Sequence, residues 1–239
     1  MAVKAYRNVV DQPWGKMFYD LVYRQLDLPE EKRLKILDFG AGFCLTADHY
    51  AKDHDVIAVE PNEEMRDLRV QNNAYTLIPR GEEYLSTLED ASMDVIICHN
   101  VLEYVADMDA ILKQFERILK PDGFISIVKH NDLGRVVFYA VLNDDPKAAL
   151  ELLDKEEDEG SIFGSRKVYN GDTILSAFSG KMSLADTYGI RTFYGLSSNN
   201  EIKFTEDWYR SMLELEMRAG SMEEYKNIAF FHHLIFRKK

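Results

Sequence analysis

Two acidic residues and two glycines have a spacing that suits the binding of a small ligand. The stretch ILDFGAGFCLTA (36–47) places Asp38 directly before a turn that contains Gly40 and Gly42. Glycines at such a turn let the backbone pass close to a ligand. Glu60 follows Asp38 by 22 positions, where a carboxylate can accept hydrogen bonds from both hydroxyls of a ribose. The four residues indicate a site for a cofactor that contains adenosine.

The same turn argues against a dinucleotide. Leu45 stands where the third glycine of a G-x-G-x-x-G fingerprint is expected. An ionised Asp38 beside the turn would repel a pyrophosphate and attract a cation. S-adenosylmethionine carries a sulfonium, an ammonium and a ribose but no phosphate, so it fits these residues. A nucleotide-dependent reductase with an imperfect glycine turn is the alternative left open by the turn alone.

The segments around the turn alternate between strand-like and helix-like patterns. Short apolar runs rich in branched residues predict five buried strands, at 34–39, 55–60, 74–79, 93–99 and 123–129. Apolar residues at helical spacing predict helices over 45–53, 62–73 and 107–120. This alternation predicts an α/β fold with a Rossmann-like, mostly parallel, doubly wound sheet and helices on both faces.

The pattern changes after residue 130. Residues 131–168 predict a helical insertion on the substrate side, at the edge of the active site. A helix near 170–180, a strand at 185–195, a helix at 205–220 and a last strand at 227–238 would complete a seven-stranded sheet. We therefore expect one domain over 1–239, composed of an N-terminal helical cap (1–33), a cofactor-binding core (34–130), the insertion (131–168) and the C-terminal completion of the sheet (169–239).

Composition and charge narrow the function classes. The chain has 239 residues and a formal net charge of −12, which repels polyanions over most of the surface. Nucleic acid could therefore bind only through a local basic patch. No uninterrupted apolar run of about 18 residues occurs, and the first residues lack the pattern of a leader. The two cysteines, Cys44 and Cys98, suggest neither a disulfide nor a metal site. We expect a cytoplasmic protein without membrane, DNA or metal partners.

Four motifs in combination resemble the class I S-adenosylmethionine-dependent methyltransferases of the methyltransferase type 11 kind. They are ILDFGAG, VIAVEPNEEM, DVIICHNVLEYV and LKPDGFISI. The resemblance implies that Asp38, Gly40 and Gly42 line the methionine portion of the cofactor and that Glu60 holds its ribose. It also implies that Met65 packs on the adenine and that Glu82 and Glu83 lie by its amino edge. His99 would end the fourth strand at the site of methyl transfer, so we count it among the cofactor-binding residues as well as the catalytic ones.

The C-terminal part carries a narrower resemblance. The succession from HNVLEYV to IVKHN, followed by YGIRTFY, LELEMR and FFHHLIFRKK, resembles the bacterial tRNA 5-carboxymethoxyuridine carboxyl methyltransferases. That family esterifies a carboxylate on the wobble uridine, so the resemblance implies tRNA as the partner. Arg191 matches the family's G-[IV]-R-x-F segment.

A carboxylate acceptor fits the residues near the end of the fifth strand. It is already ionised at neutral pH, so it needs cations to orient it and no general base. Lys129, His130 and Arg135 follow that strand, at the edge where open α/β sheets bind ligands. We nominate His130 and Arg191 as the carboxylate clamp, with His99 completing the catalytic set.

Other acceptors are weighed by the turn after the fourth strand. Amide and exocyclic-amine methylation usually goes with an N-P-P-Y turn, whereas residues 99–102 read H-N-V-L. Cys98 follows Ile97 rather than a proline, so a cytosine-C5 nucleophile is disfavoured. Two alternatives stay open: a methyltransferase for a free small molecule, and a non-catalytic S-adenosylmethionine-binding protein. The sequence does not give the oligomeric state.

Overall fold

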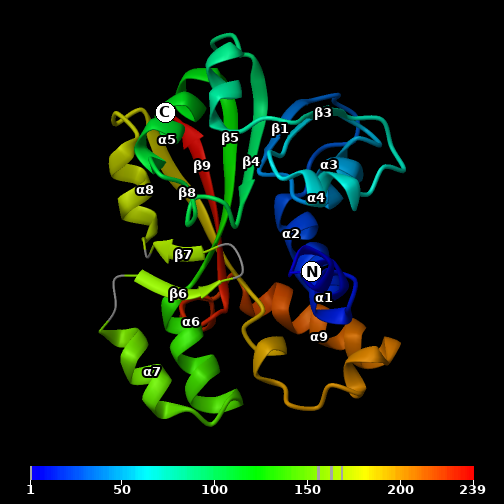
Figure 1. Cartoon of the computed structure of the whole chain (residues 1–239), viewed down its shortest axis with the longest axis vertical. Coiled ribbons are helices and arrows are strands. Elements are labelled where there is room, and N and C mark those ends of the chain that lie inside the picture. The colour runs from blue at the N-terminus through cyan, green and yellow to red at the C-terminus, as the bar shows by residue number, and fades with distance from the viewer. Residues whose placement is uncertain (1, 155–156, 162–163, 168) are drawn as a thin grey trace.

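A seven-stranded mixed sheet forms the centre of the protein, in the order β3-β2-β1-β4-β5-β9-β8 (Figure 1). The computed structural model describes residues 2–154, 157–161, 164–167 and 169–239. The strands of the sheet are β1 (Lys35–Phe39), β2 (Asp55–Val59), β3 (Thr76–Ile78), β4 (Met93–His99), β5 (Leu119–His130), β8 (Met182–Ile190) and β9 (Phe231–Lys238). The predicted doubly wound α/β fold is confirmed.

The first five strands run parallel, and β9 runs antiparallel to both of its neighbours. Because β1 and β4 are covered on both faces, they are apolar nearly throughout. Because the first five strands are parallel, their carboxyl ends meet at one edge of the sheet, which we call the carboxyl edge. The order of the strands reverses between β1 and β4, and open α/β sheets bind their ligands at the carboxyl edge beside such a switch point.

Helices cover both faces of the sheet. They are α1 (Ala2–Val10), α2 (Pro13–Leu26), α3 (Leu45–Tyr50), α4 (Glu63–Asp67), α5 (Met108–Ile118), α6 (Asp132–Val137), α7 (Pro146–Leu153), α8 (Gly171–Ala177), α9 (Glu206–Ala219) and α10 (Glu223–Lys226). The core on one face includes residues of α5 and α8, and the cores on the other include residues of α2, α3 and α9.

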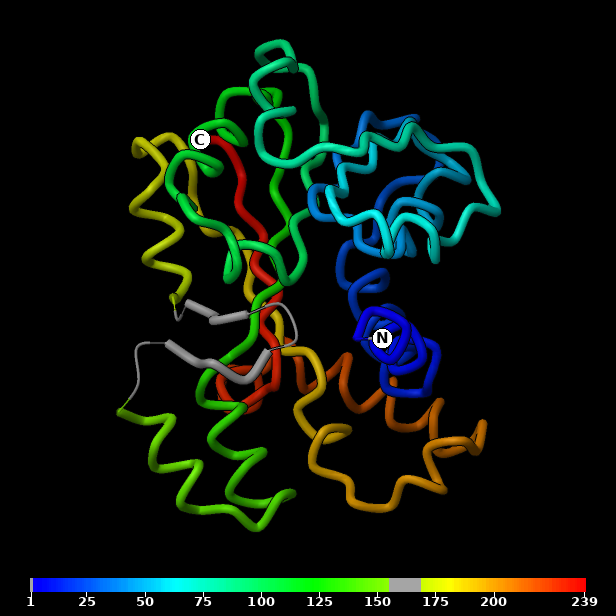
Figure 2. Tube along the Cα trace, viewed as in Figure 1, coloured from blue at the N-terminus to red at the C-terminus, as the bar shows by residue number. Residues whose placement is uncertain are grey.

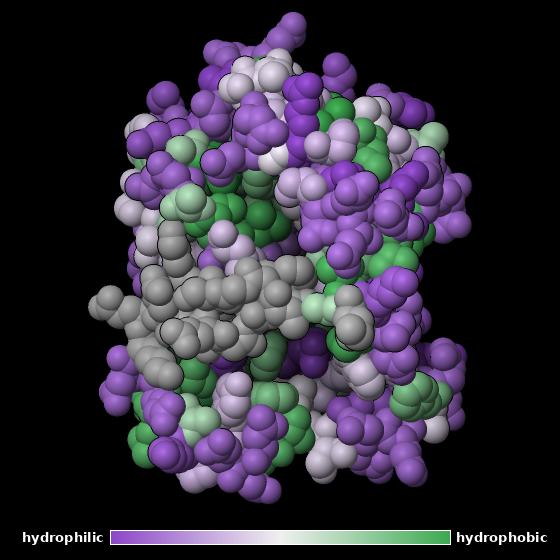
Figure 3. All heavy atoms as spheres, in the orientation of Figure 1, coloured by the Kyte–Doolittle hydropathy of each residue, from purple (hydrophilic) through white to green (hydrophobic). Residues whose placement is uncertain are grey.

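The remaining helical elements gather beyond the carboxyl edge. Figure 1 shows α6, α7 and α9 below the strands, and the trace in Figure 2 shows α1 between α9 and the loops around α4. A π-helical turn (Phe138–Leu142) joins α6 to the loop before α7, and β6 (Glu157–Ser161) pairs with β7 (Gly164–Lys167). On this face, the surface between the strands of the sheet and the helices below them is hollowed (Figure 3). The carboxyl edge therefore has walls that could enclose a ligand.

Several predicted boundaries were wrong by a few residues. The strand expected at 185–195 ends at Ile190, and Arg191 adopts a left-handed backbone conformation with φ 61°. The helix expected over 45–53 is α3, which ends at Tyr50, three residues early. Helix starts are better marked: the side chains of Asn62 and Asp107 accept the backbone N–H groups that begin α4 and α5. Among the described residues, no helix combines the length and hydrophobicity that crossing a membrane requires.

Candidate functional site

The glycine turn after β1 is held in a conformation that disfavours other residues. Gly40 and Gly42 have φ angles of 74° and 55°. The backbone N–H groups of Gly40 and Ala41 donate to the carbonyl of Val59 at 2.9 and 3.0 Å, which ties the turn to the end of β2. A Cβ atom added to Gly40 would lie 2.3 Å from Val101 Cγ2. The turn thus packs directly against the loop that follows β4.

Glu60 connects the turn to the start of α4. Its Oε2 accepts the N–H of Gly42 at 2.7 Å, and its Oε1 accepts the N–H of Asn62 at 2.8 Å. The side chain is buried, and burial raises the pKa of its carboxyl while the two backbone N–H groups lower it. Each carboxylate oxygen keeps a further lone pair, so Glu60 could accept from the hydroxyls of a ribose.

Asp38 is a buried carboxyl with one oxygen left unsatisfied. Only 3% of the residue is exposed, and no described group donates a hydrogen bond to Oδ2. Burial is the largest cause that raises the pKa of Asp38 to about 7; a hydrogen bond from the Ala47 backbone opposes it, and the charge of Glu60 adds to it. A cation here would favour the ionised form. The observed donor deficit fits the cationic amino acid end of S-adenosylmethionine.

The residues expected around adenine divide into two groups. Met65 is buried beside Phe43 and Val10, and its Sδ would lie 3.9 Å from a Cβ on Gly42. Glu82 and Glu83 are exposed at the start of a 3-10 helix (Glu82–Thr87). The carboxylate of Glu83 accepts the N–H of Gly81 at 3.1 Å. The structure brings Met65 to the turn, and it leaves both glutamates outside the buried cluster, so their adenine contact is still a prediction.

His99 ends β4, as expected, and its side chain shares a sheet face with Asp38. Asp38 pairs in register with Ile97, and side chains two residues apart on a strand point to the same face. Nε2 of His99 lies 2.8 Å from Ser126 Oγ, whereas Nδ1 is shielded from solvent and meets no hydrogen-bonding group in the described part of the chain. Asn100 follows in a left-handed conformation with φ 56°.

His130 is supported by a carboxylate that the sequence analysis missed. Glu103, 2% exposed, accepts the backbone N–H of His130 at 2.8 Å. Its two oxygens also lie 3.1 and 3.0 Å from Nδ1 of the same histidine. Because Glu103 can only accept when ionised, Nδ1 carries the proton. This contact fixes the orientation of the imidazole.

Arg191 lies just beyond β8 in a turn that a second buried carboxylate holds. Both oxygens of Glu216 accept the backbone N–H groups of Thr192, Phe193 and Tyr194, at 2.6 to 2.8 Å. The Arg191 guanidinium carbon lies 5.6 and 5.9 Å from the ring centres of Phe230 and Phe231. Its Nε has no hydrogen-bond partner among the described residues, and burial lowers the pKa of the guanidinium.

The two proposed clamp residues come together across β9. His130 on β5 and Ile190 on β8 both pair with Phe231, and the ring of His130 lies 4.7 Å from that of Phe231. Since adjacent strands lie about 5 Å apart, the residues at the two strand ends are about 10 Å apart. His130 and Arg191 therefore flank the same phenylalanine at the carboxyl edge.

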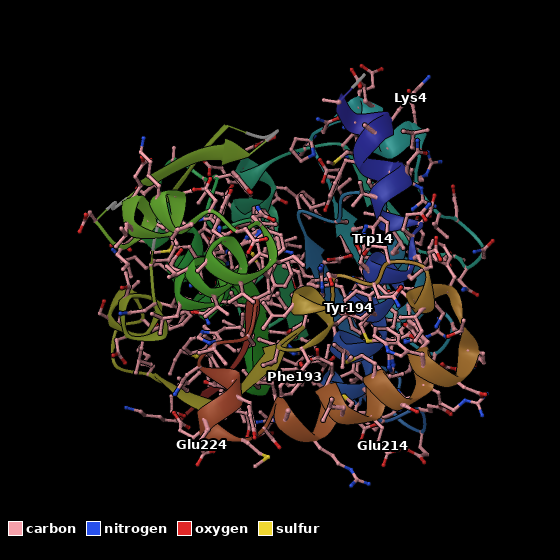
Figure 4. All side chains as sticks on the ribbon, turned by 90° about the horizontal axis from the view of Figure 1, so that it is seen from below. Lys4, Trp14, Phe193, Tyr194, Glu214 and Glu224 are labelled. Carbon is pink, nitrogen blue, oxygen red and sulfur yellow. The ribbon has the colours of Figure 1, made fainter. Side chains whose placement is uncertain are left out.

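Other cationic side chains gather at this edge. Lys129 is buried over the ring of Tyr169, at 5.2 Å, and burial lowers the pKa of its amine. Lys203 lies 4.9 Å from the ring of Tyr194. Tyr194 itself is fully buried. Figure 4 places Tyr194 near the centre of the view and Glu214 and Glu224 at the periphery.

The two supporting carboxylates, Glu103 and Glu216, carry only weak signals in the sequence. Glu103 lies four residues after His99 in the motif DVIICHNVLEYV, yet an acid in a loop after a strand is commonly solvated. Glu216 lies on the inner face of a predicted helix, where an acid is unusual. That position was the one available signal for it.

A cavity of about 700 Å³ opens at the opposite edge of the sheet, among Pro29, Asp94 and Lys120.

Comparisons with known proteins find methyltransferases. A family model described as a methyltransferase domain matches residues 37–127. The whole chain is 25% identical over 251 residues to the tRNA 5-carboxymethoxyuridine methyltransferase of Escherichia coli, and the match covers 94% of that protein. A match to the ubiquinone biosynthesis O-methyltransferase of Acinetobacter baumannii is 28% identical over 125 residues, covering 48% of this chain and 47% of that protein.

A solved structure shares the fold over nearly the whole chain. The putative S-adenosylmethionine-dependent methyltransferase of Listeria monocytogenes superposes with a TM-score of 0.61 at 12% identity, covering 94% of this chain and 97% of that one. The domain match and the relatives indicate a methyltransferase, and the solved structure shows that the chain shares the fold of an S-adenosylmethionine-dependent methyltransferase.

Proposed function

We propose that this S-adenosylmethionine-dependent methyltransferase transfers its methyl group to the carboxylate of a modified wobble uridine in tRNA. The observation that carries the proposal is Arg191, whose buried Nε lacks a hydrogen-bond partner in the described part of the chain. A guanidinium fork matches the two oxygens of a carboxylate. The relative from Escherichia coli, matched along the full chain, is named for such an acceptor.

The residues of the carboxyl edge suit this chemistry. When bound, S-adenosylmethionine supplies an electrophilic methyl group on a sulfonium. A carboxylate oxygen can attack that methyl in line without first losing a proton, so the chain has only to align the two reactants and exclude water. In this proposal Arg191 and the imidazole of His130 hold the carboxylate, and Glu103 and Glu216 keep those two groups in place.

The charge distribution gives the proposal a local basis. The whole chain carries a formal charge of −12, yet the carboxyl edge gathers Lys129, His130, Arg191 and Lys203. Such a patch can hold an anionic nucleotide on a protein that otherwise repels nucleic acid. In this proposal these residues supply the local positive charge that an acidic chain needs in order to bind tRNA, although Lys129 and Lys203 are themselves buried.

A free small-molecule acceptor is the second candidate. The ubiquinone relative, which matches about half of the chain, is named for an O-methyltransferase of a small molecule, and the net negative charge requires no adaptation for such a substrate. The two candidates differ in salt dependence. Binding of tRNA releases counterions and weakens steeply with ionic strength, whereas binding of a small acid depends on salt far less.

Transfer of labelled methyl from S-adenosylmethionine tests the proposal. The purified protein is incubated with total tRNA and, separately, with the small metabolites of the same extract. We expect label in tRNA that mild base releases as methanol, because an ester hydrolyses under these conditions. Label confined to the metabolites would transfer the assignment to a small acceptor. Base-stable label in tRNA would refute carboxylate methylation.

A further inference from the structure

A continuous chain of buried and partly buried hydrogen bonds runs from the backbone of β8 to His99. Gln25 Nε2 donates to the carbonyl oxygen of Gly189 at 3.0 Å, and Gln25 Oε1 lies 2.9 Å from His233 Nδ1. His233 Nε2 lies 2.7 Å from Ser126 Oγ, which lies 2.8 Å from His99 Nε2. Ser126 and His233 are fully buried. Five elements, α2, β8, β9, β5 and β4, contribute one group each.

The carbonyl of Gly189 fixes the direction of every bond in this chain. A carbonyl oxygen can only accept, so the amide of Gln25 must turn its NH₂ group toward Gly189 and its oxygen toward His233. That oxygen accepts from Nδ1–H of His233. The neutral ring of His233 then has a lone pair at Nε2, and the hydroxyl of Ser126 donates to it.

The same rule determines the tautomer of His99. Since the proton of Ser126 is used toward His233, its oxygen accepts from Nε2–H of His99. Burial lowers the pKa of His233 to about 3, and burial together with His233 holds the pKa of His99 well below its usual value. Both rings are therefore neutral near pH 7 and carry one N–H each. Nδ1 of His99 is left with a lone pair.

This lone pair lies where a hydrogen-bond donor is lacking. His99 and Asp38 share a sheet face at the carboxyl ends of adjacent strands. Nδ1 of His99 and Oδ2 of Asp38 are both buried acceptors without a donor among the described residues. A ligand that satisfies both atoms must offer several N–H groups, and the ammonium of S-adenosylmethionine offers three.

We infer that Gln25, His233 and Ser126 form a positioning device that keeps Nδ1 of His99 unprotonated, so that it accepts a hydrogen bond from the ammonium group of S-adenosylmethionine. The inference rests on the proposed cofactor site at Asp38 and is independent of the identity of the methyl acceptor. It also gives His99 a defined contact with the cofactor rather than with the methyl acceptor. The ionised carboxylate of the proposed acceptor has no proton to donate, and its negative charge would be repelled by the lone pair on Nδ1 of His99.

Nitrogen NMR of the ligand-free protein, labelled with ¹⁵N-histidine, reads the two tautomers directly. Substitution of His99 and of His233 by glutamine, one at a time, assigns their signals. We expect His99 protonated at Nε2 and His233 protonated at Nδ1, two opposite tautomers in one protein. The Nδ1–H tautomer of His99 would overturn the inference.

A remote substitution should reverse the chain. In Gln25→Glu, the new carboxylate favours a cationic His233, which then donates from Nε2 to Ser126. The hydroxyl of Ser126 would turn to His99 Nε2 and move the His99 proton to Nδ1. Gln71→Glu, on an exposed residue, is the matched control and should leave both histidines unchanged. A folded Gln25→Glu protein with an unchanged His99 tautomer would contradict the inference.

Ser126→Ala provides a second variant in case Gln25→Glu does not fold. Calorimetry with two probes separates the ammonium contact from a general loss of structure. S-adenosylhomocysteine has the ammonium, whereas 5′-methylthioadenosine lacks the whole amino acid portion. We expect Ser126→Ala to weaken the first by about tenfold or more, the range for a hydrogen bond to a charged group, and to leave the second unchanged.

The other outcomes each refute a distinct statement. Equal weakening of both probes would make the role of Ser126 structural. Weakening for S-adenosylmethionine but not for S-adenosylhomocysteine would place the contact at the methyl group. Both results overturn the inference. Failure of the native protein to bind either adenosyl compound would refute the cofactor assignment itself, and the tautomers would still be readable.

Discussion

The backbone N–H of Gly42 donates to Oε2 of Glu60 over 2.7 Å. One carboxylate thereby joins the glycine turn after β1 to the end of β2, so the two features that suggested an adenosine site are parts of one structure. The turn is held before any ligand arrives, which lowers the entropic cost of binding.

Glu60→Gln should weaken binding of S-adenosylhomocysteine by about tenfold or more. The amide places an NH₂ group against one of two backbone N–H donors, those of Gly42 and Asn62, and leaves that donor unsatisfied. Titration calorimetry measures the effect. Glu64→Gln, an exposed change on α4, is the control. Equal affinities for the two variants would remove Glu60 from the site.

Gly40→Ala should destabilise the fold by about 3 kcal/mol. A left-handed residue with a Cβ costs about 1–2 kcal/mol, and overpacking against Val101, 2.3 Å away, adds a similar amount. Gly180 has the same kind of φ angle, 77°, in open space. Gly180→Ala should therefore show only the cost of the left-handed backbone conformation. Urea unfolding compares the two.

The double variant Gly40→Ala, Val101→Ala isolates the contact between the two loops. Removing the valine methyl groups should return the loss of unfolding free energy toward the value for Gly180→Ala. If Gly40→Ala alone is no worse than Gly180→Ala, the close approach of the two loops is refuted.

The affinity for S-adenosylhomocysteine should rise with pH around neutrality. Burial raises the pKa of Asp38 to about 7, so the free protein holds a proton there at lower pH. The ammonium of the ligand favours the ionised carboxylate, and binding must release that proton. Affinity should therefore increase by up to about tenfold per pH unit below 7 and level off above it.

Asp38→Asn is the control for this pH profile, because the amide does not titrate. The variant should bind weakly and with a flat profile between pH 5.5 and 8. A slope as steep as that of the native protein would assign the titration to another group.

Glu216→Gln should raise the KM for the acceptor more than it lowers kcat. Glu216 accepts three backbone N–H groups in the turn after Arg191, and the amide can accept through only one oxygen. The displaced guanidinium would bind the acceptor less well, while affinity for S-adenosylhomocysteine stays unchanged. Arg191→Lys should raise KM as well, because it loses the planar fork.

Glu214→Gln is the matched control on the same helix. Its side chain is 64% exposed and pairs with Arg218, and Figure 4 shows it pointing outward from α9. Steady-state kinetics of Glu214→Gln should match those of the native protein. Identical kinetics for Glu216→Gln would show that the turn needs no such anchor.

The sequence predicted what depends on neighbouring residues. The parallel strands and the glycine turn follow from local apolar runs and from residues within a few positions of each other. The supporting contacts join distant positions: His233 lies 107 residues from Ser126 and 208 from Gln25. Only the register of β5 with β9 and the packing of α2 bring them together, and no local pattern encodes either.

The sequence predicted which acceptor-side residues to consider, but it did not predict their positions at the ends of the strands. Arg191 was expected inside a strand, yet it lies past the strand end in a left-handed turn. Glu216, 25 positions later on α9, holds the three residues that follow Arg191. A buried acid on the inner face of a helix is visible in the sequence, but its partners there are backbone N–H groups, which carry no sequence signature.

Nucleosides from the tRNA of cells that lack this protein give the most direct test of the central claim. The tRNA is digested and analysed by mass spectrometry before and after treatment with the purified protein and S-adenosylmethionine. The account predicts a uridine derivative with a free carboxyl group that treatment converts to its methyl ester, and that Arg191→Ala converts poorly. If no such nucleoside is present, or if treatment leaves it unmethylated, a tRNA carboxylate is not the acceptor.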